Sequence, residues 1–167
     1  MNFDKINEDK FLFYNKNLLL ITIYDDWFYS RNDYDHLCPN QRNYLDRFLS
    51  DQGFQRKSGQ RYEKDRLSVG IIKSLSLGVS PLDETKRSLE KFDYLAVSPM
   101  GYYLYVLDIN ADQSILKQLA QKCPINLLQA KDLSNHESFY EELLRIHPIL
   151  AKIQNETKEV HKFKRLR

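Results

Sequence analysis

The chain has 167 residues, of which 42% are hydrophobic and 13% aromatic, and its 25 basic and 23 acidic residues leave a formal net charge of +2. This composition excludes a disordered chain, because it supplies enough apolar side chains to bury a core, and the length favours one domain. The small net charge excludes an electrostatic field of the whole protein that would by itself attract nucleic acid or membrane. Charged partners are therefore expected only at local patches.

Two features of the sequence bear on where the protein works. The cysteines, Cys38 and Cys123, are too few for a disulfide framework and lack the spacing of metal ligands. The N-terminal residues lack the apolar segment of a signal peptide, and the longest apolar run, residues 18–24, is far shorter than the roughly 20 residues that span a bilayer. We therefore expect a cytoplasmic protein with free thiols and no membrane partner.

The first elements in the chain are predicted to be a hairpin and a helix. Residues 11–14 and 18–24 are β-forming runs separated by asparagines that favour a turn, which predicts the hairpin. Residues 40–52 carry apolar side chains at helical spacing between Asn40, a capping residue, and Gly53, a favourable residue after a helix.

The middle of the chain is predicted to alternate strands with one helix. Residues 54–64 read as two short polar β segments around Gly59. Residues 67–79 alternate with a period of two, which predicts one long strand. Ser80-Pro81 then combines a capping serine with a proline at the first helical position, which predicts a helix up to about residue 92.

A hairpin over residues 92–110 is predicted to form the centre of the sheet. Its strands, 91–97 and 102–109, are joined by Ser98-Pro99-Met100-Gly101, whose residue types favour a type I turn. The second strand is apolar or aromatic on both faces up to Asp108, so we predict that residues 102–109 lie in the middle of a covered sheet.

The C-terminal part is predicted to be mainly helical. A helix begins at Asp112 and ends before Pro124, a short strand spans residues 125–129, and a long helix starts near the capping box at Ser134 and is kinked by Pro148. Together the elements predict a single α+β domain over residues 1–157, with a mixed, mostly antiparallel central sheet and packed helices. A basic tail, residues 158–167, follows it.

The order of elements over residues 40–133 resembles the core of the PD-(D/E)XK nuclease superfamily. That family places an Asp on the second core strand and a (D/E)-x-K motif on the third, so that two carboxylates hold a divalent metal. The resemblance implies that Asp93 and Asp108 are the catalytic, metal-binding carboxylates, with Mg²⁺ or Mn²⁺ as the cofactor if the protein is active. Asn110 stands where the family has lysine and cannot supply its charge, which favours a divergent or inactive nuclease without a cofactor.

The geometry of the predicted 92–110 hairpin provides a test of this pair. A loop of two or four residues places Asp93 and Asp108 on one face of the sheet, whereas a loop of three residues places them on opposite faces.

A second resemblance covers residues 18–64. An apolar strand ending in Asp25, a helix, Gly53-Phe54 and the spacing of Gly59 and Tyr62 are similar to the virulence-associated protein D family of ribonuclease toxins. Both resemblances imply a nuclease from a toxin, phage-defence or mobile-element context.

Basic residues with an interleaved tyrosine indicate a candidate nucleic-acid surface. Lysine and arginine bind phosphates and an aromatic ring stacks on bases. The candidate residues lie in the 54–64 segment and in the tail: Arg56, Lys57, Arg61, Tyr62, Lys64, Lys164 and Arg165.

An alternative function is that of a non-enzymatic interaction module, such as an immunity protein or inhibitor. Residues 25–36 mix aspartates with aromatic side chains, a composition that suits binding to a protein partner with a basic surface. The candidate residues are Asp25, Asp26, Trp27, Tyr29, Asp33 and Asp35. Sequence alone leaves the enzyme and the interaction module open.

Overall fold

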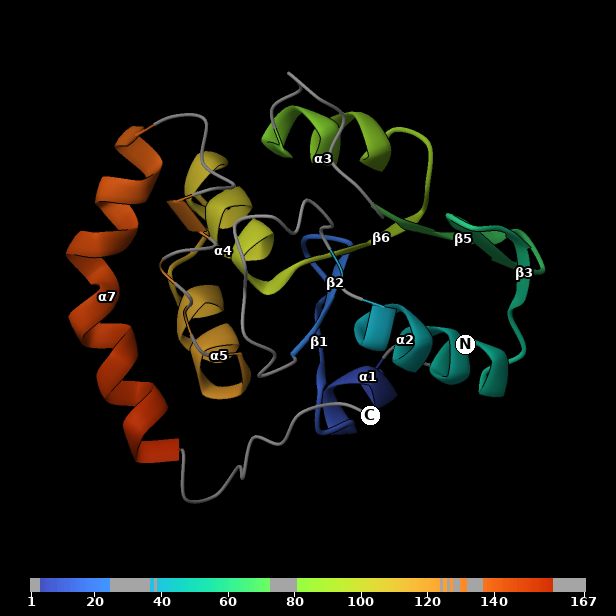
Figure 1. Cartoon of the computed structure of the whole chain (residues 1–167), viewed down its shortest axis with the longest axis horizontal. Coiled ribbons are helices and arrows are strands. Elements are labelled where there is room, and N and C mark those ends of the chain that lie inside the picture. The colour runs from blue at the N-terminus through green and yellow to red at the C-terminus, as the bar shows by residue number, and fades with distance from the viewer. Residues whose placement is uncertain are drawn as a thin grey trace.

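The computed structural model describes residues 4–24, 37, 39–72, 81–123, 125, 127, 130–131 and 137–157, which form a sheet with helices on both faces (Figure 1). The strands are β1 (Leu12–Asn15), β2 (Leu20–Ile23), β3 (Gln55–Ser58), β4 (Arg61–Lys64), β5 (Leu67–Ile71) and β6 (Tyr94–Val97). The helices are α1 (Asp4–Glu8), α2 (Pro39–Asp51), α3 (Pro81–Leu89), α4 (Pro99–Asp108), α5 (Ser114–Lys122) and α7 (Glu137–Thr157). The prediction of a single α+β domain is confirmed.

The six strands lie in the order β1-β2-β6-β5-β4-β3. β2 and β5 both pair parallel with β6, and the other three neighbouring pairs are antiparallel, so the sheet is mixed as predicted. A parallel connection requires a crossover, and α3 lies in the connection between β5 and β6. β6 and its two parallel neighbours, β2 and β5, lie in the middle of the sheet.

The predicted N-terminal hairpin is confirmed as β1 and β2. Its turn begins with the backbone N–H of Asn17, which donates to Asn15 Oδ1 at 3.0 Å, and it ends at Leu19, which adopts a left-handed φ of 57°. The side-chain amide of Asn7 holds α1 against β1, because it donates to Tyr14 O at 2.8 Å and accepts from Tyr14 N–H at 2.9 Å.

The predicted helix over residues 40–52 is confirmed as α2, although Asn40 lies inside its first turn because the helix begins one residue earlier. Leu45 and Leu49 are fully buried against the sheet. Gly53 has φ of 92°, the left-handed conformation that a residue after a helix commonly adopts and that glycine tolerates.

Residues 102–108 are helical, and the prediction of a central strand over 102–109 is wrong. They belong to α4, where Ser98 Oγ accepts a hydrogen bond from the backbone N–H of Gly101 at 3.1 Å and Pro99 is the first helical residue. A capping serine followed by proline is a start signal for a helix. The turn predicted at residues 98–101 is therefore the first turn of α4.

α4 is apolar on all sides because it is covered on all sides. It contacts β2, α3, α5 and α7, and its two central tyrosines are fully buried. Their hydroxyl groups donate to backbone carbonyls, Tyr102 to Leu20 O at 3.2 Å and Tyr103 to Cys123 O at 2.7 Å. A helix buried all round has no polar face, so its sequence lacks the helical period.

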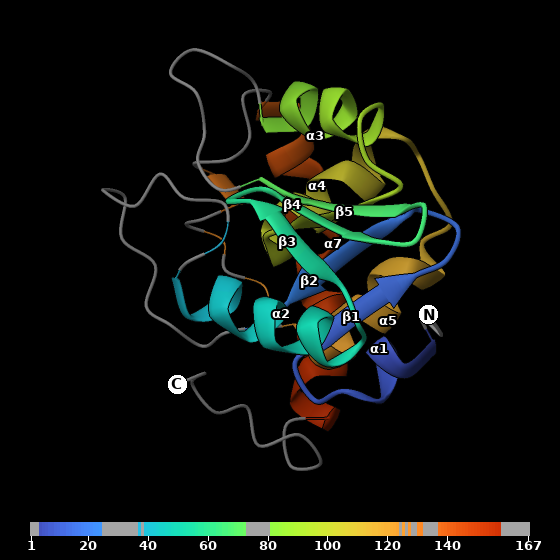
Figure 2. The same ribbon diagram turned by 90° about the vertical axis from the view of Figure 1, so that its right-hand side faces the viewer.

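Alternate residues of β6 belong to two separate cores. Leu95 and Val97 of β6 pack with α3, α4, α5 and α7, whereas Ala96 between them packs with α1 and α2. The molecule therefore has three layers, with α1 and α2 on one face of the sheet and the other helices on the opposite face (Figure 1; Figure 2).

The C-terminal helices α5 and α7 are confirmed, and α7 continues past Pro148. The strand predicted over residues 125–129 is wrong, since Leu127, Ala130 and Lys131 are helical. A short apolar run fits a strand or a buried helical segment equally, and Ala130 is buried beside α4. Among the described helices, none has the length and apolarity needed to cross a membrane.

Three predicted segments fall partly or wholly outside the described residues. The long strand predicted over 67–79 is present as β5 up to Ile71, while residues 73–80 are not described. The tail, residues 158–167, and the acidic segment, residues 25–36, are also outside the described part of the chain.

Candidate nucleic-acid interface

The β3–β4 hairpin carries most of the basic residues that the sequence analysis singled out, and it lies at one edge of the sheet (Figure 1). β3 is the last strand of the sheet, and all four of its side chains are exposed. β4 is half-buried, since it pairs with β3 on one side and with β5 on the other. The hairpin therefore presents the polar side chains of β3 to solvent.

Arg56 and Lys57 are the two cations of β3. Arg56 Nε donates to Ser58 O at 3.3 Å, and Lys57 Nζ donates to Gln55 Oε1 at 3.2 Å. Within the described part of the chain, neither side chain forms a salt bridge with a carboxylate. Because these partners are neutral, the positive charge of both side chains remains available to an anionic ligand.

Arg61 and Lys64 of β4 are held by the protein itself. Arg61 Nε forms a salt bridge with Glu63 Oε1 at 2.6 Å, and its guanidinium lies 5.2 Å from the centre of the Phe92 ring. Lys64 Nζ donates to Gln52 O at 2.6 Å, where its charge complements the negative end of the α2 dipole. Both residues therefore support the hairpin more than they extend its free positive surface.

Tyr62 does not offer its ring to a base, contrary to the stacking role suggested by its place among the basic residues. The side chain points from β4 into the core beneath α2 and is only 2% exposed. Its hydroxyl donates to Asp46 Oδ1 at 2.5 Å, and burial raises its pKa above the ordinary value. The hydrogen bond from Tyr62 to Asp46 thus joins the β3–β4 hairpin to α2.

Asp93 lies just before β6, and its carboxylate is engaged with the start of β5. Oδ2 accepts hydrogen bonds from the backbone N–H of Ser68 at 2.8 Å and from its hydroxyl at 3.1 Å. Ser68 Oγ in turn accepts from the backbone N–H of Asp93 at 3.0 Å. This reciprocal arrangement joins two parallel strands where they begin.

Asp108 is the last residue of α4 and not a strand residue. The predicted hairpin loop length therefore cannot decide whether Asp93 and Asp108 share a face of the sheet. Its carboxylate forms an ion pair with Lys86 of α3, with 2.5 Å between Nζ and Oδ2. The bond to Asp108 raises the pKa of Lys86. Among the described residues, no group of three or more His, Cys, Asp or Glu side chains is placed to hold a metal ion.

The strands that follow α2 differ from those predicted to carry the two nuclease carboxylates. From α2 onward the elements run α2, β3, β4, β5, α3, β6, so the second and third strands after α2 are β4 and β5. β5 carries no acidic residue, and the one acid of β4, Glu63, is paired with Arg61. Asp93 and Asp108 lie on neither strand.

The remaining predicted site residues lie outside the described residues. These are the nucleic-acid candidates Lys164 and Arg165 and the partner-binding candidates Asp25, Asp26, Trp27, Tyr29, Asp33 and Asp35.

Cys123 forms no disulfide, as predicted, and its side chain is fully buried. Burial raises its pKa to about 12, so the sulfur stays protonated and is neither a ready nucleophile nor a ready metal ligand.

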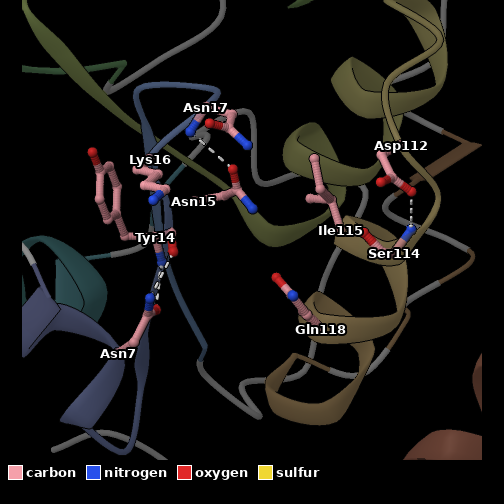
Figure 3. Close-up of a pocket in the computed structure, with 9 residues that line it drawn as sticks. All are labelled: Asn7, Tyr14, Asn15, Lys16, Asn17, Asp112, Ser114, Ile115 and Gln118. Atoms are coloured by element: carbon pink, nitrogen blue, oxygen red, sulfur yellow. Dashed lines mark hydrogen bonds between the residues drawn. The ribbon is translucent and has the colours of Figure 1, made fainter.

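A polar cavity of about 400 Å³, which the sequence did not predict, lies between the β1–β2 turn and the start of α5 (Figure 3). Asn15, Lys16 and Asn17 line one side, and Asp112 and Gln118 line the other. The sequence signals only a turn and a helix cap at these positions, because the residues that meet there are distant along the chain.

Comparison of the chain with protein-family models, with curated proteins and with solved structures gives no match. The functional argument therefore rests on the residues and their geometry.

Proposed function

We propose that this protein binds nucleic acid through the β3–β4 hairpin. The observation that carries the proposal is the pair Arg56 and Lys57, which stand on a fully exposed edge strand with only neutral hydrogen-bond partners among the described residues. Lysine and arginine side chains in such positions bind phosphates with release of counterions. Arg61 and Lys64 on the neighbouring strand β4 are also positively charged, although Arg61 is paired with Glu63 and Lys64 is hydrogen-bonded to Gln52 O.

We further propose that the domain is a divergent, nuclease-like one that has been kept for binding. The order α2, β3, β4, β5, α3, β6 supports the likeness of the arrangement. The absence of an acid from β5 and the pairing of Glu63 with Arg61 argue against a two-carboxylate metal centre on β4 and β5. The carboxylate of Asp93 accepts a hydrogen bond from Ser68, and that of Asp108 forms an ion pair with Lys86, so both side chains stabilise the fold.

Reversing both charges of β3 is expected to weaken nucleic-acid binding at least tenfold at low salt. In the variant Arg56→Glu/Lys57→Glu, two phosphate contacts are lost and two repulsive charges appear. The slope of log Kobs against log salt should become shallower by about 1.4 to 1.8 units, since each of the two contacts contributes about 0.7 to 0.9. Fluorescence anisotropy with labelled single-stranded RNA, single-stranded DNA and duplex DNA measures both quantities.

The matched control is Lys117→Glu/Lys152→Glu, which reverses two exposed cations on α5 and α7. Each reversal changes the charge by two, so both double variants fall from the formal +2 to −2. The control should retain most of the binding and of the salt slope. Equal losses in both variants, or no binding by the unmodified protein, would reject the hairpin as the interface.

Replacing Asp108 with alanine is expected to leave nucleic-acid cleavage unchanged, with or without Mg²⁺ or Mn²⁺, because the carboxylate forms an ion pair with Lys86 and takes no part in catalysis. The variant should lose only about 0.5 to 1 kcal/mol of stability, the contribution of a partly exposed ion pair, as measured by urea denaturation. Lys86→Ala should cost a similar amount. A metal-dependent nuclease activity that disappears in a folded Asp108→Ala protein would restore the catalytic role of Asp108.

A further inference from the structure

The cavity between the β1–β2 turn and α5 has the size and the fixed walls of a small-molecule site. Its volume of about 400 Å³ lies in the range of roughly 300 to 1,000 Å³ that such sites occupy. The turn that carries Asn15, Lys16 and Asn17 forms one wall, α1 contributes Asn7, and the start of α5 forms the facing wall (Figure 3).

Hydrogen bonds within the protein hold these walls in place. The amide of Asn7 is used at both ends by the backbone of Tyr14, and Asn15 Oδ1 accepts from the backbone N–H of Asn17. On the facing wall, Asp112 Oδ1 accepts from the backbone N–H of Ser114 at 2.9 Å. The site is therefore organised before any ligand enters.

Several polar groups of the cavity are left over for a ligand. Within the described residues, the side-chain amides of Asn17 and Gln118 form no hydrogen bond, and Asn15 uses its oxygen but not its Nδ2. Figure 3 shows the side chains of Asn15 and Gln118 pointing into the space between the two walls. A primary amide offers both donors and an acceptor, which is the pattern that the peptide group complements.

The charges of the lining define the ligand further. Among the described residues, Lys16 and Asp112 are the only lysine, arginine, aspartate or glutamate side chains that line the cavity, and they come from opposite walls (Figure 3). A ligand with one positive and one negative group would pair both of them. A phosphate group at Lys16 would leave its excess negative charge in a cavity that also holds Asp112, and a neutral sugar would pair with neither charge.

Aromatic stacking adds little in this cavity. Of the described residues in the lining, Tyr14 alone is aromatic, and its ring packs against Tyr94 with 6.0 Å between the ring centres. Ile115 supplies an aliphatic surface. A flat base would thus lack the aromatic partner on which bases usually stack.

From these features we infer that the cavity binds a zwitterion of the α-amino acid type, either a free amino acid or a dipeptide. Its carboxylate pairs with Lys16 and its ammonium group with Asp112, while Asn15, Asn17 and Gln118 bind the peptide group of a dipeptide or the side-chain amide of an amino acid such as glutamine. The inference is independent of nucleic-acid binding, which uses the opposite edge strand of the sheet.

Isothermal titration with L-glutamine and with L-alanyl-L-alanine tests this inference. Binding is expected for at least one of them, and the comparison of the two distinguishes an amino-acid site from a dipeptide site. Acetylation of the amino group or amidation of the carboxylate of the bound compound should weaken binding at least tenfold, because either change removes one of the two charge pairs.

Two variants connect the binding to named groups. Lys16→Ala should weaken binding of the zwitterion and make it insensitive to amidation, and Gln118→Ala should weaken binding without changing the melting temperature. The control Lys117→Ala replaces an exposed residue of α5 that is outside the lining and should bind like the unmodified protein. The inference is overturned if neither compound binds, if the capped compounds bind equally well, or if AMP or glucose binds more tightly.

Discussion

Replacing Tyr102 with alanine is expected to lower the free energy of unfolding by about 3 to 5 kcal/mol, the range for truncating a buried aromatic side chain. Tyr102 lies at the centre of α4 with no exposed surface, and its ring meets Phe13 edge-to-face with 5.4 Å between ring centres. Its removal opens a cavity between the sheet and the helices that cover it. Urea denaturation followed by circular dichroism measures the loss.

The variant Tyr102→Phe separates the ring from its hydroxyl. The hydrogen bond to Leu20 O is lost, which should cost about 1 kcal/mol. If Tyr102→Ala proved as stable as Tyr102→Phe, α4 would not be the buried centre of the domain.

The sequence of α4 shows why its residue pattern could not distinguish a strand from a helix. Ser80-Pro81 and Ser98-Pro99 carry the same start signal for a helix, but the residues that follow them differ. After Ser80-Pro81, Leu82 and Thr85 are buried three residues apart with polar residues between and after them, which gives a helical period. Beyond Ser98-Pro99 every position is apolar or aromatic up to Asp108, because α4 is enclosed on all sides.

The turn residues of this segment fit both interpretations for a physical reason. The second and third residues of a type I turn have nearly helical backbone angles, so Ser98-Pro99-Met100-Gly101 suits a turn and a first helical turn alike. The aromatic and β-branched residues that follow favour a strand by propensity. Tertiary burial decided the outcome, and burial is not local information.

Elsewhere the sequence predicted the elements well, because local signals mark them. The N-terminal hairpin, α2, the β3–β4 hairpin, α5 and α7 all show a period or a terminal signal. Which residues form a site was harder to predict. The exposure of Arg56 and Lys57 follows from a polar edge segment, but the burial of Tyr62 depends on α2 packing over β4, and the cavity depends on two elements distant in sequence.

The last prediction concerns Gly70, a buried residue of β5 whose missing side chain makes room for Phe92. A Cβ atom at Gly70 would lie 2.3 Å from Phe92 Cδ2 and 2.5 Å from Phe92 Cγ, far inside van der Waals contact. Gly70→Ala should therefore destabilise the protein by about 1 to 3 kcal/mol, the usual cost of overpacking a core, as measured by urea denaturation. The ring must move, and its contact with the Arg61 guanidinium will loosen with it.

Gly59 in the β3–β4 turn provides the matched control for this substitution. Its φ is not positive, and the nearest atom to an added Cβ is Arg56 Nη2 at 3.9 Å, so Gly59→Ala should be neutral or stabilising by up to about 1 kcal/mol. The origin of the effect at Gly70 can be isolated in a Phe92→Ala background, where no ring opposes the new methyl group. There Gly70→Ala should cost less than about 0.5 kcal/mol, and a cost as large as in the unmodified protein would show that the strain does not come from Phe92.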